Sequence, residues 1–328
     1  MNDRGDLTLD VHLDEDALAA ELRGDVEAGL SDTPRWLSPR WFYDAVGSRL
    51  FERITELPEY YLYRSETEVL TRRVVEIAAL AGPTVVVELG SGYSTKTRLL
   101  LDALAAIGDL RGIVTLDVSA SALQDAGEHL RERYPDVPLH AIVGDYTRHL
   151  PVVPDPPVGV RRLLVFLGST IGNLTPDERA AFLGQCAEAL RPGEHFLLGT
   201  DLVKPEEVVQ PAYDDAQGVT AEFNRNILHV IRRRLDADVV PEDFAHEAWW
   251  DPGEQWVQVA LRAVRPTRIT VPGLVDATFV EGDRILTEIS AKFTEERIDA
   301  ELSAAGFATD ARWTDDAGWF AVTLATRR

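Results

Sequence analysis

The chain has 328 residues and a mass of 36.3 kDa; 45% of its residues are hydrophobic and 27% are charged. This balance is typical of a folded protein with a substantial core and excludes a largely disordered chain. Acidic residues number 55 against 33 basic ones, for a formal net charge of −22. Such a charge repels nucleic-acid backbones and anionic lipid surfaces, so we expect a small-molecule partner, no nucleic acid and no membrane.

The N-terminal residues are acidic, unlike a secretory signal, and no apolar run approaches the roughly 18 residues of a membrane span. The single cysteine, Cys186, excludes an internal disulfide, and its apolar surroundings favour core packing over a reactive thiol. The seven histidines are scattered without the spacing of metal ligands, so no metal is expected. We therefore predict a cytoplasmic protein, and we expect a monomer because no segment indicates a dimer seam.

From residue 84 onward, short β-branched runs alternate with helical patterns, which indicates βαβ units. Strands are predicted at 84–89, 112–117, 139–145, 161–168 and 195–202, and helices at 95–107, 119–134 and 176–190. The last helix has the clearest start. Thr175 can cap it, Pro176 takes its first position, and Glu178 is placed to close a capping box.

The C-terminal part predicts one more capped helix, ended by Gly306, and then a β-hairpin. Five parallel strands followed by a helix and a hairpin predict a Rossmann-like α/β sheet of seven strands with an antiparallel last strand. This arrangement is associated with class I S-adenosylmethionine (SAM) methyltransferases. We assign residues 64–200 and 288–328 to this SAM-binding domain. Residues 1–63 and 201–287 remain, and we expect them to form a substrate-binding domain.

The first predicted strand runs directly into Gly90 and Gly92, which form a tight turn with backbone N–H groups free to meet a ligand. Asp117 and Asp145 end the next two strands, where one carboxylate can accept both ribose hydroxyls and the other the adenine amino group. The third glycine of a dinucleotide fingerprint is missing, which favours SAM. Each aspartate could instead only cap the following turn. Lys96 suits either a solvated position or the cofactor's carboxylate.

Seven segments from about residue 34 onward carry long and unusual motifs. They are WFYDAVGSRLFERITELPEYY (41–61), VELGSGYSTKTRLLLDAL (87–104), DVSASAL (117–123), FLGSTIGNLTPDERAAFL (166–183), DLVKPEEVV (201–209), AYDDAQGVTAEFNRN (212–226) and TEISAKF (287–293). In these segments the chain resembles the SAM-dependent L-histidine Nα-methyltransferases of ergothioneine biosynthesis. The resemblance implies an enzyme that transfers three methyl groups from SAM to the α-amino group of histidine. The products would be histidine betaine (hercynine) and S-adenosylhomocysteine.

The resemblance, joined to the glycine turn, also implies site residues. The cofactor contacts would be Tyr43, Gly90, Gly92, Lys96, Asp117, Asp145 and Tyr146. The substrate contacts would be Gly168 lining the site, Asn173 and Tyr213 at the α-amino and carboxylate ends, Tyr60, Glu288 and Ser290 at the imidazole, and Val259 beside it. The Tyr43 and Tyr60 hydroxyls are the catalytic candidates, since they could orient the amine or relay its proton. From position alone, the tyrosines could be packing residues, and Glu288 and Ser290 could belong to an exposed edge strand.

Three departures from the family pattern keep the substrate open. Leu62-Tyr63 stands where Pro-Thr is expected, Tyr146 where phenylalanine is expected, and Val259 where methionine is expected. The smaller Val259 would enlarge the pocket, which allows tryptophan, tyrosine or phenylalanine as the acceptor. A plain phenyl ring would leave Glu288 desolvated at a cost of roughly 1–3 kcal/mol, which favours histidine. A non-catalytic SAM- or nicotinamide-binding protein is a further alternative.

Overall fold

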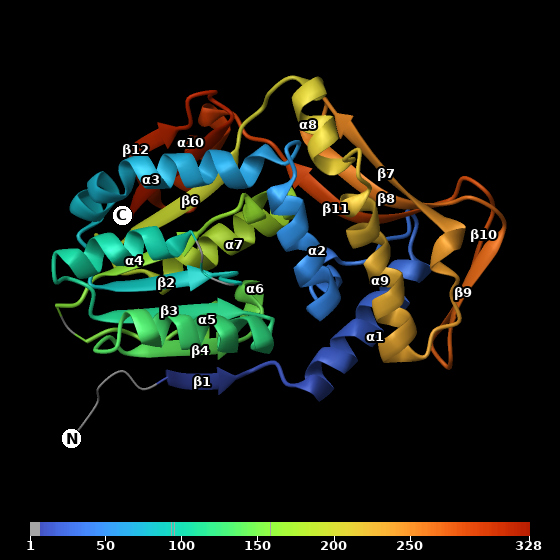
Figure 1. Ribbon diagram of the computed structural model, residues 1–328, viewed down its shortest axis with the longest axis horizontal. Helices are drawn as coiled ribbons and strands as arrows, with labels where there is room; N and C mark the ends of the chain where they lie inside the picture. Colours follow the sequence, from blue (N-terminus) through green and yellow to red (C-terminus); the bar gives the residue numbers. More distant parts are fainter. Residues whose placement is uncertain (1–6, 93, 95, 158) are drawn as a thin grey trace. The chain divides into compact units, whose positions relative to one another are not determined.

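The computed structural model describes residues 7–92, 94, 96–157 and 159–328, which divide into two units (Figure 1). Unit 1 contains the residues up to Leu13, Leu62–Val203 and Lys292–Arg328. Unit 2 contains Asp14–Tyr61 and Lys204–Ala291. Among the described helices, none combines the length and the apolar character that a membrane span requires.

Unit 1 is built on one eight-stranded sheet with the strand order β1-β4-β3-β2-β5-β6-β13-β12. Its strands are β1 (Leu7–Val11), β2 (Val85–Leu89), β3 (Gly112–Asp117), β4 (Leu139–Val143), β5 (Arg162–Phe166), β6 (His195–Asp201), β12 (Phe307–Thr314) and β13 (Phe320–Arg327). Strands β1 to β6 are parallel, and β13 lies antiparallel between β6 and β12. The predicted class I methyltransferase fold with its C-terminal antiparallel hairpin is confirmed.

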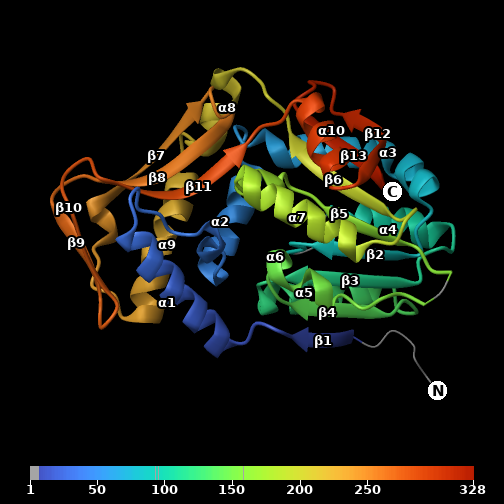
Figure 2. The same cartoon turned by 180° about the vertical axis from the view of Figure 1, so that it is seen from behind.

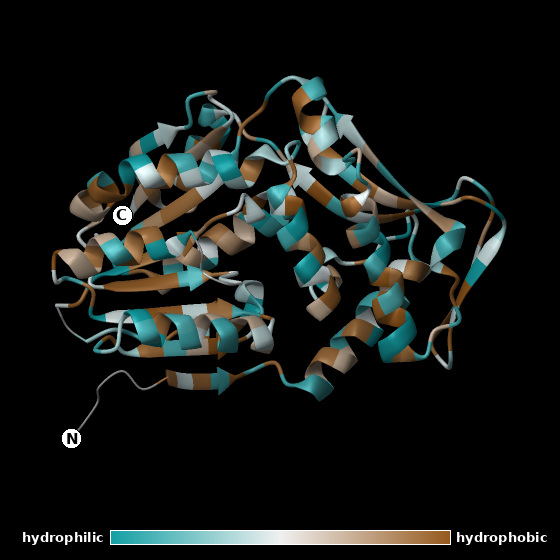
Figure 3. Ribbon diagram, in the orientation of Figure 1, coloured by the Kyte–Doolittle hydropathy of each residue, from teal (hydrophilic) through white to brown (hydrophobic). Residues whose placement is uncertain are grey.

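Helices cover both faces of this sheet: α3 and α4 lie in front in Figure 1, and α7 and α10 lie in front in Figure 2. The helices of unit 1 are α3 (Tyr61–Ala81), α4 (Thr97–Ala106), α5 (Ala120–Arg133), α6 (Tyr146–His149), η2 (Leu150–Val152), η3 (Thr170–Asn173), α7 (Pro176–Ala189) and α10 (Glu295–Ala304). A parallel strand covered on both faces is apolar throughout, and every residue of β5 is buried. Figure 3 shows the same contrast, with hydrophobic strands behind helices whose outer faces are largely hydrophilic.

The predicted start of α7 is confirmed in detail. The Thr175 side chain accepts from the Glu178 backbone N–H, and the Glu178 carboxylate accepts from the Thr175 N–H at 2.8 Å. These reciprocal bonds satisfy two backbone donors that the helix cannot satisfy itself. They also fix the chain directly after η3, the short helix that carries the candidate residue Asn173.

Two parts of the predicted domain division differ from the structure. Residues 7–13 belong to unit 1 and not, as predicted, with residues 14–63, because β1 pairs in parallel with β4 and adds an eighth strand that was not predicted. The predicted boundary at residue 288 is also wrong, because β11 (Arg284–Ala291) is one continuous strand of unit 2. Glu288 and Ser290 therefore belong to unit 2 and not to unit 1.

Unit 2 combines two chain segments around one core. Its helices and strands are α1 (Glu15–Ser31), η1 (Pro39–Phe42), α2 (Ala45–Glu56), α8 (Glu206–Tyr213), α9 (Val219–Leu235), η4 (Pro241–Asp243), β7 (Phe244–Asp251), β8 (Trp256–Ala263), β9 (Thr267–Val271), β10 (Val275–Phe279) and β11. Strands β11, β8 and β7 form an antiparallel sheet in that order, and β9 and β10 form a hairpin. Leu22 and Val26 from the first segment share the core with Ile227 and Leu261 from the second.

The ion pair between Lys292 and Asp201 gives a test of how unit 1 is held together. The Lys292 Nζ lies 2.9 Å from the Asp201 Oδ2, and both side chains are fully buried. We expect Lys292→Met to lower the free energy of unfolding by about 3–5 kcal/mol, because a buried carboxylate loses its cation. Urea unfolding measures this loss.

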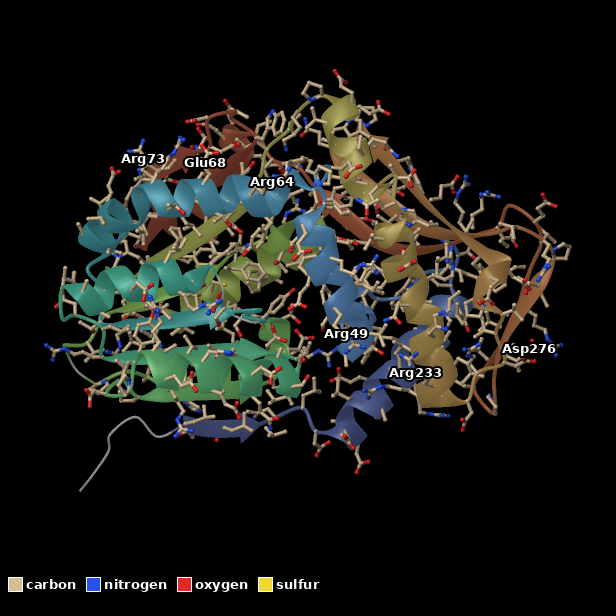
Figure 4. The ribbon with its side chains drawn as sticks, viewed as in Figure 1. Arg49, Arg64, Glu68, Arg73, Arg233 and Asp276 are labelled. Carbon is tan, nitrogen blue, oxygen red and sulfur yellow. The ribbon has the colours of Figure 1, made fainter. Side chains whose placement is uncertain are left out.

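The control for this prediction is Arg73→Met on α3. Arg73 pairs with Glu76 at 3.3 Å, and both side chains are about half exposed. Figure 4 labels Arg73 on the outer side of α3. A surface pair contributes only about 0–1 kcal/mol, so this variant should stay close to the unchanged protein. Equal losses in the two variants would contradict the role of the buried pair.

Candidate active site

The turn after β2 has the backbone expected of a ligand cradle. Gly90 and Gly92 both have positive φ angles, +62° and +47°, which only glycine adopts without strain. The Gly90 N–H donates to the Leu116 carbonyl at 2.8 Å, so the turn is tied to the end of β3. A β-carbon at Gly92 would have no atom of the described residues beyond its chain neighbours within 4 Å, and the buried Ser91 hydroxyl has no hydrogen-bond partner among these residues. A bound polar ligand can supply the partner that this hydroxyl lacks.

Asp117 and Asp145 stand where the sequence placed them, at the ends of β3 and β4. The Asp117 carboxylate accepts from the Gly92 N–H at 2.9 Å and from the Ser119 N–H at 2.8 Å. Burial raises the pKa of Asp117, and these backbone bonds oppose the shift. Asp145 caps α6 and accepts from the Thr147 N–H at 2.9 Å. Both aspartates thus make the turn-capping contacts considered above, while the ribose and adenine roles stay predictions.

A third carboxylate, Glu88, lies within β2 directly below the turn. It accepts from the Ser94 hydroxyl at 2.6 Å and from the Thr97 hydroxyl. Burial raises the pKa of Glu88 to about 7, although the two hydroxyl bonds and the nearby Lys96 lower it. Ser94 has a φ of +51°, so its bond to Glu88 holds a left-handed residue in place.

Tyr146 lies beside the glycine turn. A β-carbon at Gly90 would come within 3.7 Å of the Tyr146 ring, and that ring packs edge-on against Phe166 with 5.0 Å between centroids. Burial raises the pKa of the Tyr146 hydroxyl, which keeps it protonated. The structure therefore brings Gly90 and Tyr146 together, as the predicted cofactor set requires.

Lys96 and Gly168 are also neighbours, although 72 positions separate them in the chain. A β-carbon at Gly168 would lie 3.7 Å from the Lys96 Nζ. Both residues bind Glu66, a fully buried side chain on α3 that the sequence analysis missed. A signal was present, since Glu66 precedes the apolar Val69 and Leu70 by three and four residues and so shares their helix face.

Asn173 is the last residue of η3, and the two residues before this short helix are unusual. Gly168 and Ser169 have φ angles of +81° and +57°. The Ser169 hydroxyl accepts from the Asp201 N–H at 2.9 Å, which ties the loop to the end of β6. The position of Asn173 therefore depends on two consecutive left-handed residues that must be held from outside the loop.

In unit 2, the two candidate catalytic tyrosines pack against one phenylalanine. The Phe51 ring lies edge-on to Tyr43 at 5.6 Å and to Tyr60 at 6.2 Å between centroids. Tyr43 also contacts Phe223 at 5.5 Å, and 37% of it is exposed. Phe51 was not predicted, and it fixes both rings in the same neighbourhood.

The remaining substrate candidates meet on the sheet of unit 2. The Tyr213 hydroxyl is hydrogen-bonded to the Ser290 hydroxyl at 2.7 Å, from α8 to β11. Val259 on β8 is the direct cross-strand partner of Glu288, so their side chains share a face. The register shifts between Leu286 and Glu288, which marks a bulge at this point of the strand. Four of the predicted substrate residues are thus contiguous.

Behind Tyr213 lies a polar pair that was not predicted. The Asn224 side-chain amide donates to the His246 Nδ1 at 2.9 Å, which leaves the His246 Nε2 to donate to the Tyr213 carbonyl at 2.8 Å. Burial lowers the pKa of His246 and so favours this neutral form. The pair holds the end of α8, from which Tyr213 reaches Ser290.

The predicted residues thus form two sets. Unit 1 holds Gly90, Gly92, Lys96, Asp117, Asp145, Tyr146, Gly168 and Asn173, and unit 2 holds Tyr43, Tyr60, Tyr213, Val259, Glu288 and Ser290. Within residues 7–92, 94, 96–157 and 159–328, no three histidine, cysteine or acidic side chains are grouped so that they could hold a metal ion.

The pKa of Glu88 makes a testable prediction about pH. A carboxyl group whose pKa rises from 4.5 to about 7 on folding stabilises the fold fully below pH 4.5, and this contribution is lost as the pH rises through 7. The loss amounts to about 3 kcal/mol. We expect Glu88→Gln to remove most of this loss between pH 5 and 8, as measured by urea unfolding at both pH values. The same pH dependence in both proteins would contradict it.

Comparison with known proteins identifies the same family as the resemblance in the sequence motifs. The family described as "Histidine-specific methyltransferase, SAM-dependent" matches residues 22–327. A histidine N-alpha-methyltransferase of Mycolicibacterium smegmatis is 48% identical over 98% of this chain and 99% of its own length. One from Mycobacterium tuberculosis is 49% identical over 96% and 98%.

A more distant relative is the ergothioneine biosynthesis protein 1 of Neurospora crassa. It is 31% identical over 86% of this chain, which spans 32% of that protein. The family match covers nearly the whole chain, and it includes both units. The chain belongs to the SAM-dependent histidine-specific methyltransferases.

Proposed function

We propose that this enzyme transfers three methyl groups from SAM to the α-amino group of L-histidine and forms hercynine in ergothioneine biosynthesis. The two bacterial relatives named histidine N-alpha-methyltransferase support the reaction, and the Neurospora protein supports the pathway. The observation that carries the proposal is the contiguous group of Tyr213, Ser290, Glu288 and Val259 in unit 2. It combines hydrogen-bonding side chains with an apolar wall, which suits an imidazole ring.

The cofactor would bind at the glycine turn of unit 1. The open space at Gly92 and the unsatisfied Ser91 hydroxyl fit a polar ligand, and Asp117 and Asp145 supply acceptors for hydroxyl and amino groups. No phosphate has to approach these carboxylates, which agrees with SAM as the ligand. SAM supplies an electrophilic methyl group on a sulfonium and leaves as S-adenosylhomocysteine.

The chain's own contribution to the reaction is to position the amine and to receive its proton. We assign the α-carboxylate and the amino group of the substrate to Asn173 and Tyr213. The hydroxyls of Tyr43 and Tyr60 are assigned to orient the amine or to pass its proton to water. Displacement by a neutral amine needs little more than alignment, and alignment alone can supply about 7–11 kcal/mol of the barrier.

Recognition of imidazole is assigned to Glu288 and Ser290. An imidazole ring has a donor and an acceptor nitrogen, which a carboxylate and a hydroxyl can satisfy together. Tyr213 orients the Ser290 hydroxyl through their 2.7 Å bond. An acceptor without ring nitrogens would leave Glu288 desolvated, which disfavours it by about 1–3 kcal/mol.

One observation favours a second candidate substrate. Val259 lies directly opposite Glu288 and is smaller than the methionine of the family pattern, so the apolar wall beside the ring is set further back. A bulkier aromatic amino acid such as tryptophan gains room there, and its indole N–H could still donate to Glu288. Tyrosine and phenylalanine are the remaining acceptors of this class.

The experiment that decides between these substrates is mass-resolved methyl transfer from SAM to a panel of amino acids. The panel contains histidine, its mono- and dimethyl forms, tryptophan, tyrosine and phenylalanine. Trimethylated histidine is expected as the dominant product. A preference for tryptophan would replace the proposed substrate, and no transfer to any of them would overturn the proposed function.

Two substitutions should separate the acceptor side from the cofactor side. Glu288→Ala is expected to lower kcat/KM for histidine about 10- to 100-fold and to leave SAM affinity nearly unchanged, because it removes an imidazole partner. Asp117→Ala should weaken SAM binding about tenfold or more, because a carboxylate acceptor is lost. Calorimetry with SAM and steady-state kinetics give both numbers. Equal losses of SAM affinity in the two variants would show that Glu288 is structural.

A further inference from the structure

Glu66 is a charged side chain with no exposed surface, and neither the predicted site nor the proposed mechanism uses it. It lies on α3 of unit 1, and its carboxylate lies against Gly199 of strand β6. A buried carboxylate is costly unless it is paired and hydrogen-bonded, so its partners show what it stabilises.

The partners of Glu66 come from two different loops. The Gly168 N–H donates to its two oxygens at 2.8 and 3.0 Å, from the loop after β5. The Lys96 ammonium forms an ion pair with it, from the loop between β2 and α4. The centroid of the Tyr63 ring lies 5.5 Å from the same Lys96 Nζ, which is within the range of a cation–π interaction. One carboxylate therefore joins a predicted cofactor residue to a predicted substrate loop.

The sheet leaves room for this carboxylate by having a glycine at one position. A β-carbon at Gly199 of β6 would overlap the Glu66 Oε1, and its φ does not otherwise require glycine. A larger residue at 199 would push the carboxylate away from Gly168. The absence of a side chain in the middle of a strand usually costs stability, which indicates a specific use of the space.

The Gly168 bond also matters for backbone conformation. Gly168 and Ser169 are consecutive left-handed residues, and the chain continues from them into η3 and Asn173. Glu66 holds the first of the two through its N–H, and the Asp201 N–H holds the second through the Ser169 hydroxyl. Without Glu66, one of these two restraints is lost, and the loop can relax toward less strained angles.

We propose that Glu66 is a positioning residue for methyl transfer: it fixes Lys96 and the 168–173 loop in one arrangement and so couples the cofactor site to the acceptor site. This inference rests on the proposed function. Glu66 is assigned no contact with substrate or cofactor. It acts through Lys96 on the cofactor side and through Gly168 and Asn173 on the acceptor side.

The test compares Glu66→Gln with Glu68→Gln in the full-length enzyme. Glutamine keeps the shape of Glu66 and one acceptor for Gly168, but it cannot neutralise Lys96. Glu68 is a matched control on the same helix, since it also pairs with a cation, Arg72, and accepts a backbone N–H, from Asp316 at 3.1 Å. It lies on the outer side of α3 (Figure 4).

We expect Glu66→Gln to lower affinity for S-adenosylhomocysteine about tenfold in calorimetry and to raise the KM for histidine at saturating SAM by a similar factor. Glu68→Gln should leave both within about twofold of the unchanged enzyme, the scale of a surface pair. Thermal unfolding monitors the fold in each variant. A Glu66→Gln protein that loses stability but keeps both constants would show a purely structural role and overturn the proposal.

If Glu66→Gln does not fold, Lys96→Met decides the question, because Lys96 is partly exposed. Coupling through Glu66 predicts that this variant also raises the histidine KM at saturating SAM at least threefold. A lysine that serves the cofactor alone would leave that KM unchanged, and this result would overturn the proposal.

Failure of the proposed function is recognised separately, as absent methylation of histidine by the unchanged enzyme. Product binding and the KM of the preferred acceptor would then still test Glu66.

Discussion

Buried and half-buried carboxylates hold the loops at the carboxyl ends of the parallel strands. Asp117 accepts the Gly92 N–H, Glu88 accepts the Ser94 hydroxyl, and Glu66 accepts the Gly168 N–H. A carboxylate is acceptor-only and can take several N–H or O–H donors at once, so one side chain can fix a loop whose backbone has no strand partner. These acceptors hold the left-handed residues Gly92, Ser94 and Gly168 in place, and the glycine turn proposed to bind the cofactor is one of the loops that they fix.

Unit 2 holds its candidate residues in place by other kinds of contact. Its candidate residues are fixed by ring packing around Phe51 and by cross-strand neighbours on β11 and β8. The Tyr213–Ser290 bond and the His246–Asn224 pair add polar restraints there. An apolar wall with a small number of placed polar groups is typical of a pocket for a small molecule, which agrees with the substrate role proposed for these residues.

Much of unit 1 could be predicted because its strands are buried on both faces and its helices carry caps. The run at β5 and the Thr175 cap of α7 are examples. Strand β1 could not, because it is a five-residue edge strand with exposed residues at three positions and so lacks the burial pattern of the inner strands. Glu66 was missed because it acts on residues 30 and 102 positions away. The glycine turn and the strand-end aspartates were placed by pattern, whereas Tyr43, Tyr60 and Tyr213 were placed by resemblance alone.

The pairing of β1 with β4 has a consequence for the order in which the chain can fold. Residues 14–61 leave the ribosome before any of the partners that they meet in the core of unit 2, such as Ile227 and Leu261. At synthesis rates of about 5–20 residues per second, this segment waits many seconds with its apolar side chains uncovered. Strand β1 can pair as soon as β4 has been made, and α3 returns the chain to the same sheet. Residues 14–61 then form a loop that is closed at both ends. This closure limits the other segments that they can contact before their partners in unit 2 have been synthesised.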